Sequence, residues 1–304
     1  MEERECQVER NFPKPEGLLY HYTDQKGLLG ILGDKNIWAT HTKYLNDASE
    51  GQIVTQILID RFTNAYESLN AEVLTQGLSM GTWFASPKAF ISSFSEKGDL
   101  LSQWRAYSGG TGGYSIGFTP DYLHDVGGSF LCERQDRFYS EMDHLARCIY
   151  YDENIKKSAD AEIEGLVSAF IQQANSSQGQ AVEIGTEGIG ATAALAASHF
   201  IGLGKLSAVT KHAGFREEAE WRLAFLLTPN STPSDLKFRP GSSMPVPYLE
   251  IPLTWGDRPI EVKEIIIGPC PHPNEASESI TMLLKKEHIS GVSVICSNIP
   301  YRDW

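Results

Sequence analysis

A pair of glutamates close to an arginine is the feature of this sequence with the clearest chemical use. The segment Glu218-Ala219-Glu220-Trp221-Arg222 has the composition of a strand. Alternation along a strand then places Glu218, Glu220 and Arg222 on one face. Two such carboxylates can divide roles, one stabilising positive charge and one acting as a base. The simpler alternative is a solvated strand face with an internal Glu–Arg ion pair.

A lone histidine is the second candidate. His21 lies between Tyr20 and Tyr22 at the end of an apolar run. A neutral imidazole at this position can hydrogen-bond a ribose hydroxyl. The alternative is a histidine whose hydrogen bonds are satisfied within the core.

Two hydroxyls and two aromatic rings complete the set of local candidates. Ser93 and Ser95 share one face of a predicted strand, where they can orient a carboxylate or contact a ligand. Trp104 and Tyr107 precede a glycine-rich turn and can stack on a flat ring such as nicotinamide or a base. The alternatives are ordinary edge-strand hydroxyls and hydrophobic packing.

Other chemistries lack their sequence signatures. The chain has no GxGxxG or P-loop segment for a nucleotide, and neither an HExxH nor a GxSxG motif. Its histidines are scattered without metal-ligand spacing. The five cysteines form no CxxC pair, so we expect neither a zinc knuckle nor a disulfide framework, and a reducing cytoplasm fits best.

Composition and charge narrow the class of protein. With 304 residues, 41% hydrophobic and 21% charged, the chain is typical of a soluble globular protein. The net charge of −13 excludes a non-specific nucleic-acid coat protein but leaves room for a local basic groove. No apolar run reaches about eighteen residues, so we expect no membrane span. The charged stretch from Met1 to Arg10 is not that of a signal peptide.

The predicted elements do not alternate regularly between strand and helix, which favours an α+β fold over a doubly wound sheet. We expect a flexible arm over residues 1–17, followed by one domain over residues 18–304 that contains a mainly helical insertion at about 121–207. Asp24 or the preceding threonine is suited to cap a first helix, and Gly33 to end it. Strands are expected at 18–22, 37–40, 89–95, 114–118, 218–227, 261–267 and 292–296, and further helices at 49–69 and 100–107.

Several of these motifs resemble a known group of enzymes. The segment LYHYT at 19–23, followed by GLLGIL at 27–32, is similar to the start of ADP-ribosyltransferase-type domains, including the DNA-modifying DarT toxins. The chain also resembles a bacterial domain-of-unknown-function family seen in defence contexts. That resemblance covers most of residues 18–120 and 205–300. Its motifs are Tyr44-Leu45-Asn46-Asp47 with Glu50, Ser93-Phe94-Ser95 with Trp104 and Tyr107, the segments 113–118 and 218–222, and the tail 262–268.

The resemblance implies a fold and a mechanism. The fold is an ADP-ribosyltransferase-like split β-sandwich, and NAD is the co-substrate, with no metal required. Glu220 would bond the 2′-hydroxyl of the ribose whose oxocarbenium-like cation it stabilises. Glu218 would take the proton of the incoming nucleophile. His21 would hold the adenosine-side ribose.

The remaining cofactor-binding residues follow from the same resemblance. Ser93 or Ser95 would orient Glu220, while Tyr44, Trp104 or Tyr107 would stack on nicotinamide. The set of residues expected to bind NAD is completed by Tyr22 and Asn46.

The leading hypothesis is therefore an NAD-dependent mono-ADP-ribosyltransferase, a glycosyltransferase that acts as a cytoplasmic toxin or anti-phage defence effector. Its acceptor would be a macromolecule, with RNA or DNA ahead of protein, and an antitoxin would be its inhibitor. One alternative is an NAD glycohydrolase, in which water replaces the acceptor. The other is a catalytically inert binding module on the same fold. Labelled NAD, incubated alone and with nucleic acid or lysate, distinguishes the three.

Overall fold

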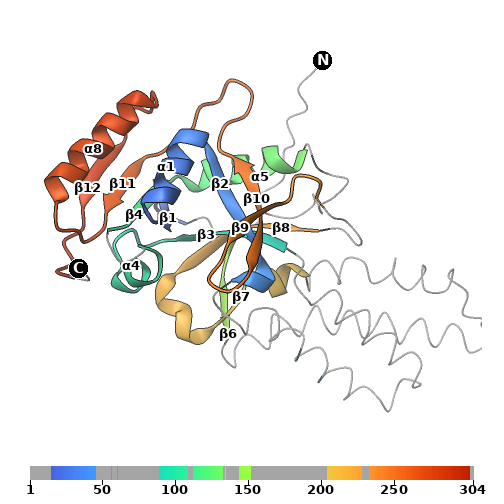
Figure 1. Ribbon diagram of the computed structural model, residues 1–304. Coiled ribbons are helices and arrows are strands. Elements are labelled where there is room, and N and C mark those ends of the chain that lie inside the picture. Colours follow the sequence, from blue (N-terminus) through green and yellow to red (C-terminus); the bar gives the residue numbers. More distant parts are fainter. Residues whose placement is uncertain are drawn as a thin grey trace, which may run out of the picture. The chain divides into compact units, whose positions relative to one another are not determined.

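The computed structural model describes residues 15–45, 56, 60, 89–108, 112–132, 134, 144–151, 204–227 and 233–301 (Figure 1). The chain divides into two compact units. The first, here called the sheet unit, comprises Met1–His41, Phe90–Cys148 and Phe215–Trp304, and the second unit comprises Thr42–Ala89 and Ile149–Gly214. The expected N-terminal arm and most of the expected helix 49–69 lie outside the described residues.

The sheet unit combines one large sheet with four described α-helices, which confirms the α+β class. Its strands are β1 (Leu19–Thr23), β2 (Asn36–His41), β3 (Ala89–Ser95), β4 (Tyr114–Phe118), β5 (Leu145–Arg147), β8 (Glu220–Leu226), β9 (Lys237–Pro240), β10 (Pro245–Pro252), β11 (Glu264–Ile267) and β12 (Ser293–Cys296). Its helices are α1 (Gln25–Asp34), α4 (Leu101–Tyr107), α5 (Pro120–Cys132) and α8 (Pro273–Lys286).

The strands follow the order β12-β11-β4-β1-β3-β2-β10-β9, and β8 joins β3 to β5 (Figure 1). Strand β3 therefore has three partners, although a strand has only two edges. It pairs with β1 at Ser95 and with β2 at Phe90 and Ile91. The sheet consequently branches at β3, next to the strands that carry the residues singled out in the sequence.

Alternation along the strands gives the sheet two different faces. Leu19, Phe94 and Ile116 point into the main core, which α1, α5 and α8 also fill. The residues between them point the other way. On that second face, Tyr22 packs with Trp104 and Ile266 in a smaller aromatic cluster.

Helix α1 illustrates how local sequence determines an element. The Asp24 side chain accepts a hydrogen bond from the backbone N–H of Gly27 at 2.7 Å and caps the helix, as the sequence predicts. Leu28, Ile31 and Leu32 are its buried residues. The helix passes the expected end at Gly33 and stops after Asp34, because Lys35 adopts the left-handed conformation with φ of 56°.

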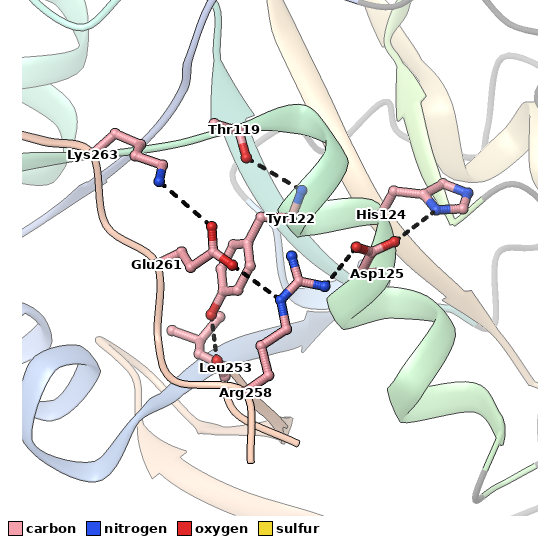
Figure 2. A network of polar contacts seen from close by, with 8 residues as sticks. All are labelled: Thr119, Tyr122, His124, Asp125, Leu253, Arg258, Glu261 and Lys263. Carbon is pink, nitrogen blue, oxygen red and sulfur yellow. Dashed lines mark hydrogen bonds and ion pairs between the residues drawn. The ribbon is translucent and has the colours of Figure 1, made fainter. Parts of the chain in front are cut away.

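Helix α5 is held by a polar network around Arg258 (Figure 2). The Arg258 guanidinium donates through Nη1 to Asp125 at 2.7 Å and through Nε to Glu261 at 3.0 Å. The hydroxyl of Tyr122 donates to the backbone oxygen of Leu253. These contacts join the helix to the connection between β10 and β11. The structure thus assigns α5, the start of the helical insertion expected at 121–207, to the core of the sheet unit.

Little of the second unit is described. A 3₁₀ turn spans Thr42–Tyr44, and the two-stranded parallel sheet pairs β6 (Ile149–Tyr151) with β7 (Thr210–His212). Gln56 and Asp60 are helical, and the Gln56 amide donates to the Asp60 carboxylate at 2.9 Å.

Candidate active site

Three neighbouring strands carry five of the ten residues that the sequence predicts to act in chemistry. His21 and Tyr22 lie on β1, Ser93 and Ser95 on β3, and Glu220 on β8. Strand β3 pairs with both of the others. The structure therefore brings together segments that are up to about 200 positions apart in the sequence.

The two faces of the sheet then separate these residues. Phe94 and Trp221 point into the main core, so alternation turns Ser93, Ser95 and Glu220 to the second face. Tyr22 belongs to the aromatic cluster on that same face. His21 instead shares the core side with Leu19, and its ring lies 5.7 Å from that of Phe94.

His21 joins β1 to β3 through its side chain. Its Nδ1 lies 2.9 Å from the backbone oxygen of Ser93. A carbonyl oxygen only accepts, so Nδ1 carries the proton, and Nε2 is the acceptor of the neutral ring. Burial lowers the pKa of His21. The bond to Ser93 is that of the alternative, a histidine satisfied within the fold, while a contact of His21 with a ribose stays a prediction.

The expected alignment of the two glutamates on one strand face is wrong. Glu218 ends a 3₁₀ segment, and β8 begins only at Glu220. Between them, Ala219 has φ of 43°, a left-handed conformation that breaks the alternation. Alanine gives no sequence signal for such a conformation, which glycine and asparagine usually occupy.

Contacts from the end of β3 hold this unusual backbone. The Ser95 hydroxyl donates to the backbone oxygen of Glu218 at 2.6 Å, and the Glu96 N–H donates to the oxygen of Ala219 at 3.1 Å. Ser95 also accepts from the N–H of Lys97 at 3.0 Å. The hydroxyl predicted to orient a catalytic carboxylate thus orients the main chain that leads into Glu220.

Glu220 and Arg222 form a buried ion pair on one face of β8. Nε of Arg222 donates to Oε1 of Glu220 at 2.8 Å, and the two residues are only 1% and 4% exposed. The sequence allowed for an internal Glu–Arg pair, but one in solvent. Out of water, the guanidinium fixes the direction of the carboxylate, and its charge offsets the desolvation of that anion.

The aromatic candidates are part of the interior. Trp104 is 1% exposed and donates through Nε1 to Asp99 at 2.7 Å. Its ring meets that of Tyr22 edge-on, with 4.7 Å between centroids. Tyr107 is half-buried against the same cluster. Hydrophobic packing, the alternative given for Trp104, is therefore what the structure shows.

The hydroxyl of Tyr22 is hydrogen-bonded to the backbone of the segment between β3 and α4. The hydroxyl donates to the backbone oxygen of Lys97 at 2.6 Å and accepts from the N–H of Leu100 at 3.1 Å. Burial raises the pKa of Tyr22. The phenol is therefore a neutral structural group that shapes the loop 96–100.

Two predicted cofactor residues do not belong to the described part of the sheet unit. Tyr44 lies in the second unit, where it is 38% exposed. Asn46 lies outside the described residues.

Glu96 is a functional candidate that the sequence analysis missed. Its carboxylate accepts from Nε1 of Trp221 at 2.8 Å and lies 3.5 Å from Nε of Arg147. Glu96 thereby ties the end of β3 to β8 and β5. The Ser-Phe-Ser-Glu order was a visible signal, but the partner of Glu96 lies 125 positions away and depends on the fold.

Comparison with known proteins adds one family. Residues 103–223 match the model of a family described as a protein of unknown function, DUF2971. The match supports a resemblance to a family of unknown function, but its range includes the insertion at about 121–207, which the expected resemblance left out. It runs from α4 through α5 into β8, so Trp104, Glu218 and Glu220 lie inside it and the predicted residues of β1 and β3 lie before it. No curated protein and no solved structure matches the chain.

Two kinds of feature are absent from the described residues. No group of three or more histidine, cysteine, aspartate or glutamate side chains in this part of the chain has the arrangement of a metal site. None of the helices described here is long and apolar enough to cross a membrane.

Proposed function

We propose that this protein is an NAD-dependent ADP-ribosyltransferase that acts inside the cell as a toxin or anti-phage defence effector. The observation that carries the proposal is the buried carboxylate of Glu220 on the sheet face that it shares with Ser93, Ser95 and Tyr22. The resemblance of the LYHYT, Ser-Phe-Ser and Glu-Ala-Glu segments to such enzymes supplies the reaction class. RNA or DNA is preferred over protein as the acceptor.

Cleavage of the bond between ribose and nicotinamide requires an anion that is held away from water. When the bond between ribose C1′ and the nicotinamide nitrogen breaks, its electron pair leaves with nicotinamide and C1′ becomes cationic. A preorganised carboxylate stabilises that cation more strongly in a dry site than in water. Glu220 has this environment, and Arg222 prevents it from turning away.

The acceptor then completes the reaction. Its oxygen or nitrogen forms a bond to C1′, and its proton passes to a base. Glu218 remains our proposed base, although its position before β8 removes the argument from a shared strand face. His21 enters the proposal as the residue that holds β1 on β3, since its side chain lies on the core side.

The displacement of Glu218 from β8 favours a second candidate function. With Glu218 before β8 and not beside Glu220 on one strand face, water can act as the nucleophile, and the protein would be an NAD glycohydrolase. An effector of either kind requires an inhibitor in its host, so an antitoxin protein is an expected partner.

One experiment tests both candidates. The protein is incubated with NAD labelled in its adenylate half, alone and with RNA, DNA or cell lysate, and nicotinamide release is measured beside label on macromolecules. Label on an acceptor supports transfer, and nicotinamide release without label supports hydrolysis. Absence of both with the folded protein contradicts the proposal. The matched control is Glu264→Gln, which changes a half-buried carboxylate of the same sheet to which the proposal gives no role.

A further inference from the structure

The C-terminal segment Ser297–Tyr301 contacts the connection that follows β3. Oδ1 of Asp99 accepts two hydrogen bonds, from Nε1 of Trp104 at 2.7 Å and from the hydroxyl of Ser297 at 2.6 Å. One carboxylate oxygen thereby joins a buried tryptophan of α4 to Ser297, which lies 198 positions after Asp99 in the chain.

The same segment is fixed at both of its ends. The N–H of Ser297 donates to the backbone oxygen of Ile267 at 2.7 Å, which continues the parallel pairing of β11 with β12. Ile299 donates its N–H to the Ser297 hydroxyl at 3.1 Å and packs against the aromatic cluster. The guanidinium carbon of Arg105 lies 5.1 Å from the ring centroid of Tyr301. In Figure 1 the chain after β12 accordingly runs beside α4.

The neighbours of Trp104 leave its ring little room to move as long as these contacts persist. Tyr22 meets one side of its ring at 4.7 Å between centroids. Gly268 lies so close that an added Cβ would come within 2.8 Å of Cε3. Asp99 is the hydrogen-bond partner of Trp104 that also bonds the C-terminal segment.

We infer that Ser297–Tyr301 is a latch that holds loop 96–100 and helix α4 against β1, with Asp99 as the positioning residue that connects the two. The latch closes one end of the sheet face on which Ser95 and Glu220 lie. Its effect on NAD rests on the proposed function. When the latch is open, helix α4 with Trp104 and Tyr107 can move away from β1, and NAD then binds less tightly.

Amide hydrogen exchange in the full-length protein tests the latch without reference to NAD. Ser297→Ala removes the hydroxyl that reaches Asp99, while Thr281→Ala is the control because it removes a hydroxyl hydrogen bond on exposed α8. Losing a hydrogen bond to a charged group makes local opening about tenfold more frequent. We therefore expect amide exchange across 96–108 to be about tenfold faster in Ser297→Ala than in the wild-type protein. In Thr281→Ala the exchange rate of these residues should not change. Faster exchange confined to 297–301 would overturn the latch.

Two changes at Asp99 test its role as the connector. Asp99→Asn keeps an acceptor oxygen for Trp104 and Ser297 but loses the charge that strengthens both bonds, so exchange across 96–108 should lie between the wild-type rate and that of Ser297→Ala, whereas Asp99→Ala should match or exceed Ser297→Ala. Equal exchange in both Asp99 variants would refute the assignment. If Asp99→Ala fails to fold, the comparison of Ser297→Ala with Asp99→Asn still decides.

Kinetics separate the latch from the proposed function. In a protein that cleaves NAD, Ser297→Ala should raise KM for NAD about tenfold with little change in kcat, because the contact acts on binding and not on the reacting bond. A collapsed kcat at unchanged KM would contradict this role. A wild-type protein that releases no nicotinamide would refute the proposed function, and the exchange result would stand by itself.

Discussion

The hydroxyl of Tyr20 on β1 donates to the carboxylate of Glu264 on β11 at 2.9 Å, across the strand that separates them. Gly117 on β4 is the direct pairing partner of both residues. A Cβ at position 117 would lie 3.0 Å from Cε1 of Tyr20. The tyrosine ring reaches Glu264 because the residue between them has no side chain.

Gly117→Ala should therefore destabilise the sheet unit. The added methyl group forces the Tyr20 ring to move, and overpacking of this kind costs about 1–3 kcal/mol. The free energy of unfolding from urea titration is the measurement. Gly128→Ala in α5 is the control, because a Cβ there meets nothing within 4 Å and alanine favours a helix by about 1 kcal/mol. A loss in Gly128→Ala as large as in Gly117→Ala would contradict the steric argument.

Tyr20 also makes the stability depend on alkaline pH. Burial and the hydrogen bond to Glu264 raise the pKa of Tyr20 from 10.0 to about 12. The unfolded chain then loses this proton first, so the stabilisation is complete below pH 10 and is lost as pH rises to about 12. Tyr20→Phe should flatten the fall in melting temperature over this range. An unchanged slope would mean that Tyr20 ionises normally in the folded protein.

His21 gives the opposite dependence at acidic pH. Burial lowers the pKa of His21 below its ordinary value of 6.5. Below that value the unfolded chain binds the proton and the folded chain resists it, so stability falls as pH decreases from 6.5. His21→Asn keeps a donor at the position of Nδ1 for the Ser93 oxygen and should remove this component. Identical acid-unfolding curves for the two proteins would exclude His21 as its source.

Glu220→Gln should abolish NAD cleavage. The change removes the charge proposed to stabilise the ribose cation, and loss of such a contact costs about a hundredfold or more in rate. It also breaks the buried ion pair with Arg222, and breaking such a pair costs about 3–5 kcal/mol of stability. Nicotinamide release and urea unfolding measure the two effects.

A double variant separates these effects of Glu220. Glu220→Gln combined with Arg222→Met removes both charges and should recover most of the lost stability, while NAD cleavage stays absent. Wild-type turnover in either folded variant would exclude Glu220 as the catalytic glutamate.

Local features of the fold could be predicted from the sequence, and contacts between distant segments could not. Asp24 and the apolar residues of α1 lie within ten positions of one another, so spacing alone predicts the helix and its cap. Tyr20 and Glu264 are 244 positions apart. Their contact exists only because β4 lies between β1 and β11.

The candidate site shows the same division. The residue types around Glu220 indicated an ion pair with Arg222, and the structure has it. The burial of this ion pair depends on the packing of the whole sheet. The charged composition of the segment alone therefore indicated a strand face exposed to solvent. The conformation of Ala219 was also hidden, since hydrogen bonds from Ser95 and Glu96 on another strand hold it.

The role of Glu218 is the sharpest remaining test of mechanism. Its backbone oxygen is held by Ser95, and Glu218→Gln leaves that bond in place. If Glu218 is the base for the acceptor, the variant should lose most transfer while NAD hydrolysis continues, because water needs no tightly held base and Glu220 still stabilises the cation. Glu217→Gln is the matched control on the neighbouring exposed residue. Nicotinamide release and acceptor labelling are measured in one reaction.

Equal loss of both activities in Glu218→Gln would mean that Glu218 is no dedicated acceptor base. Retention of both would place the base elsewhere, and Glu96, which lies at the junction of β3 with β8, would be the next residue to change.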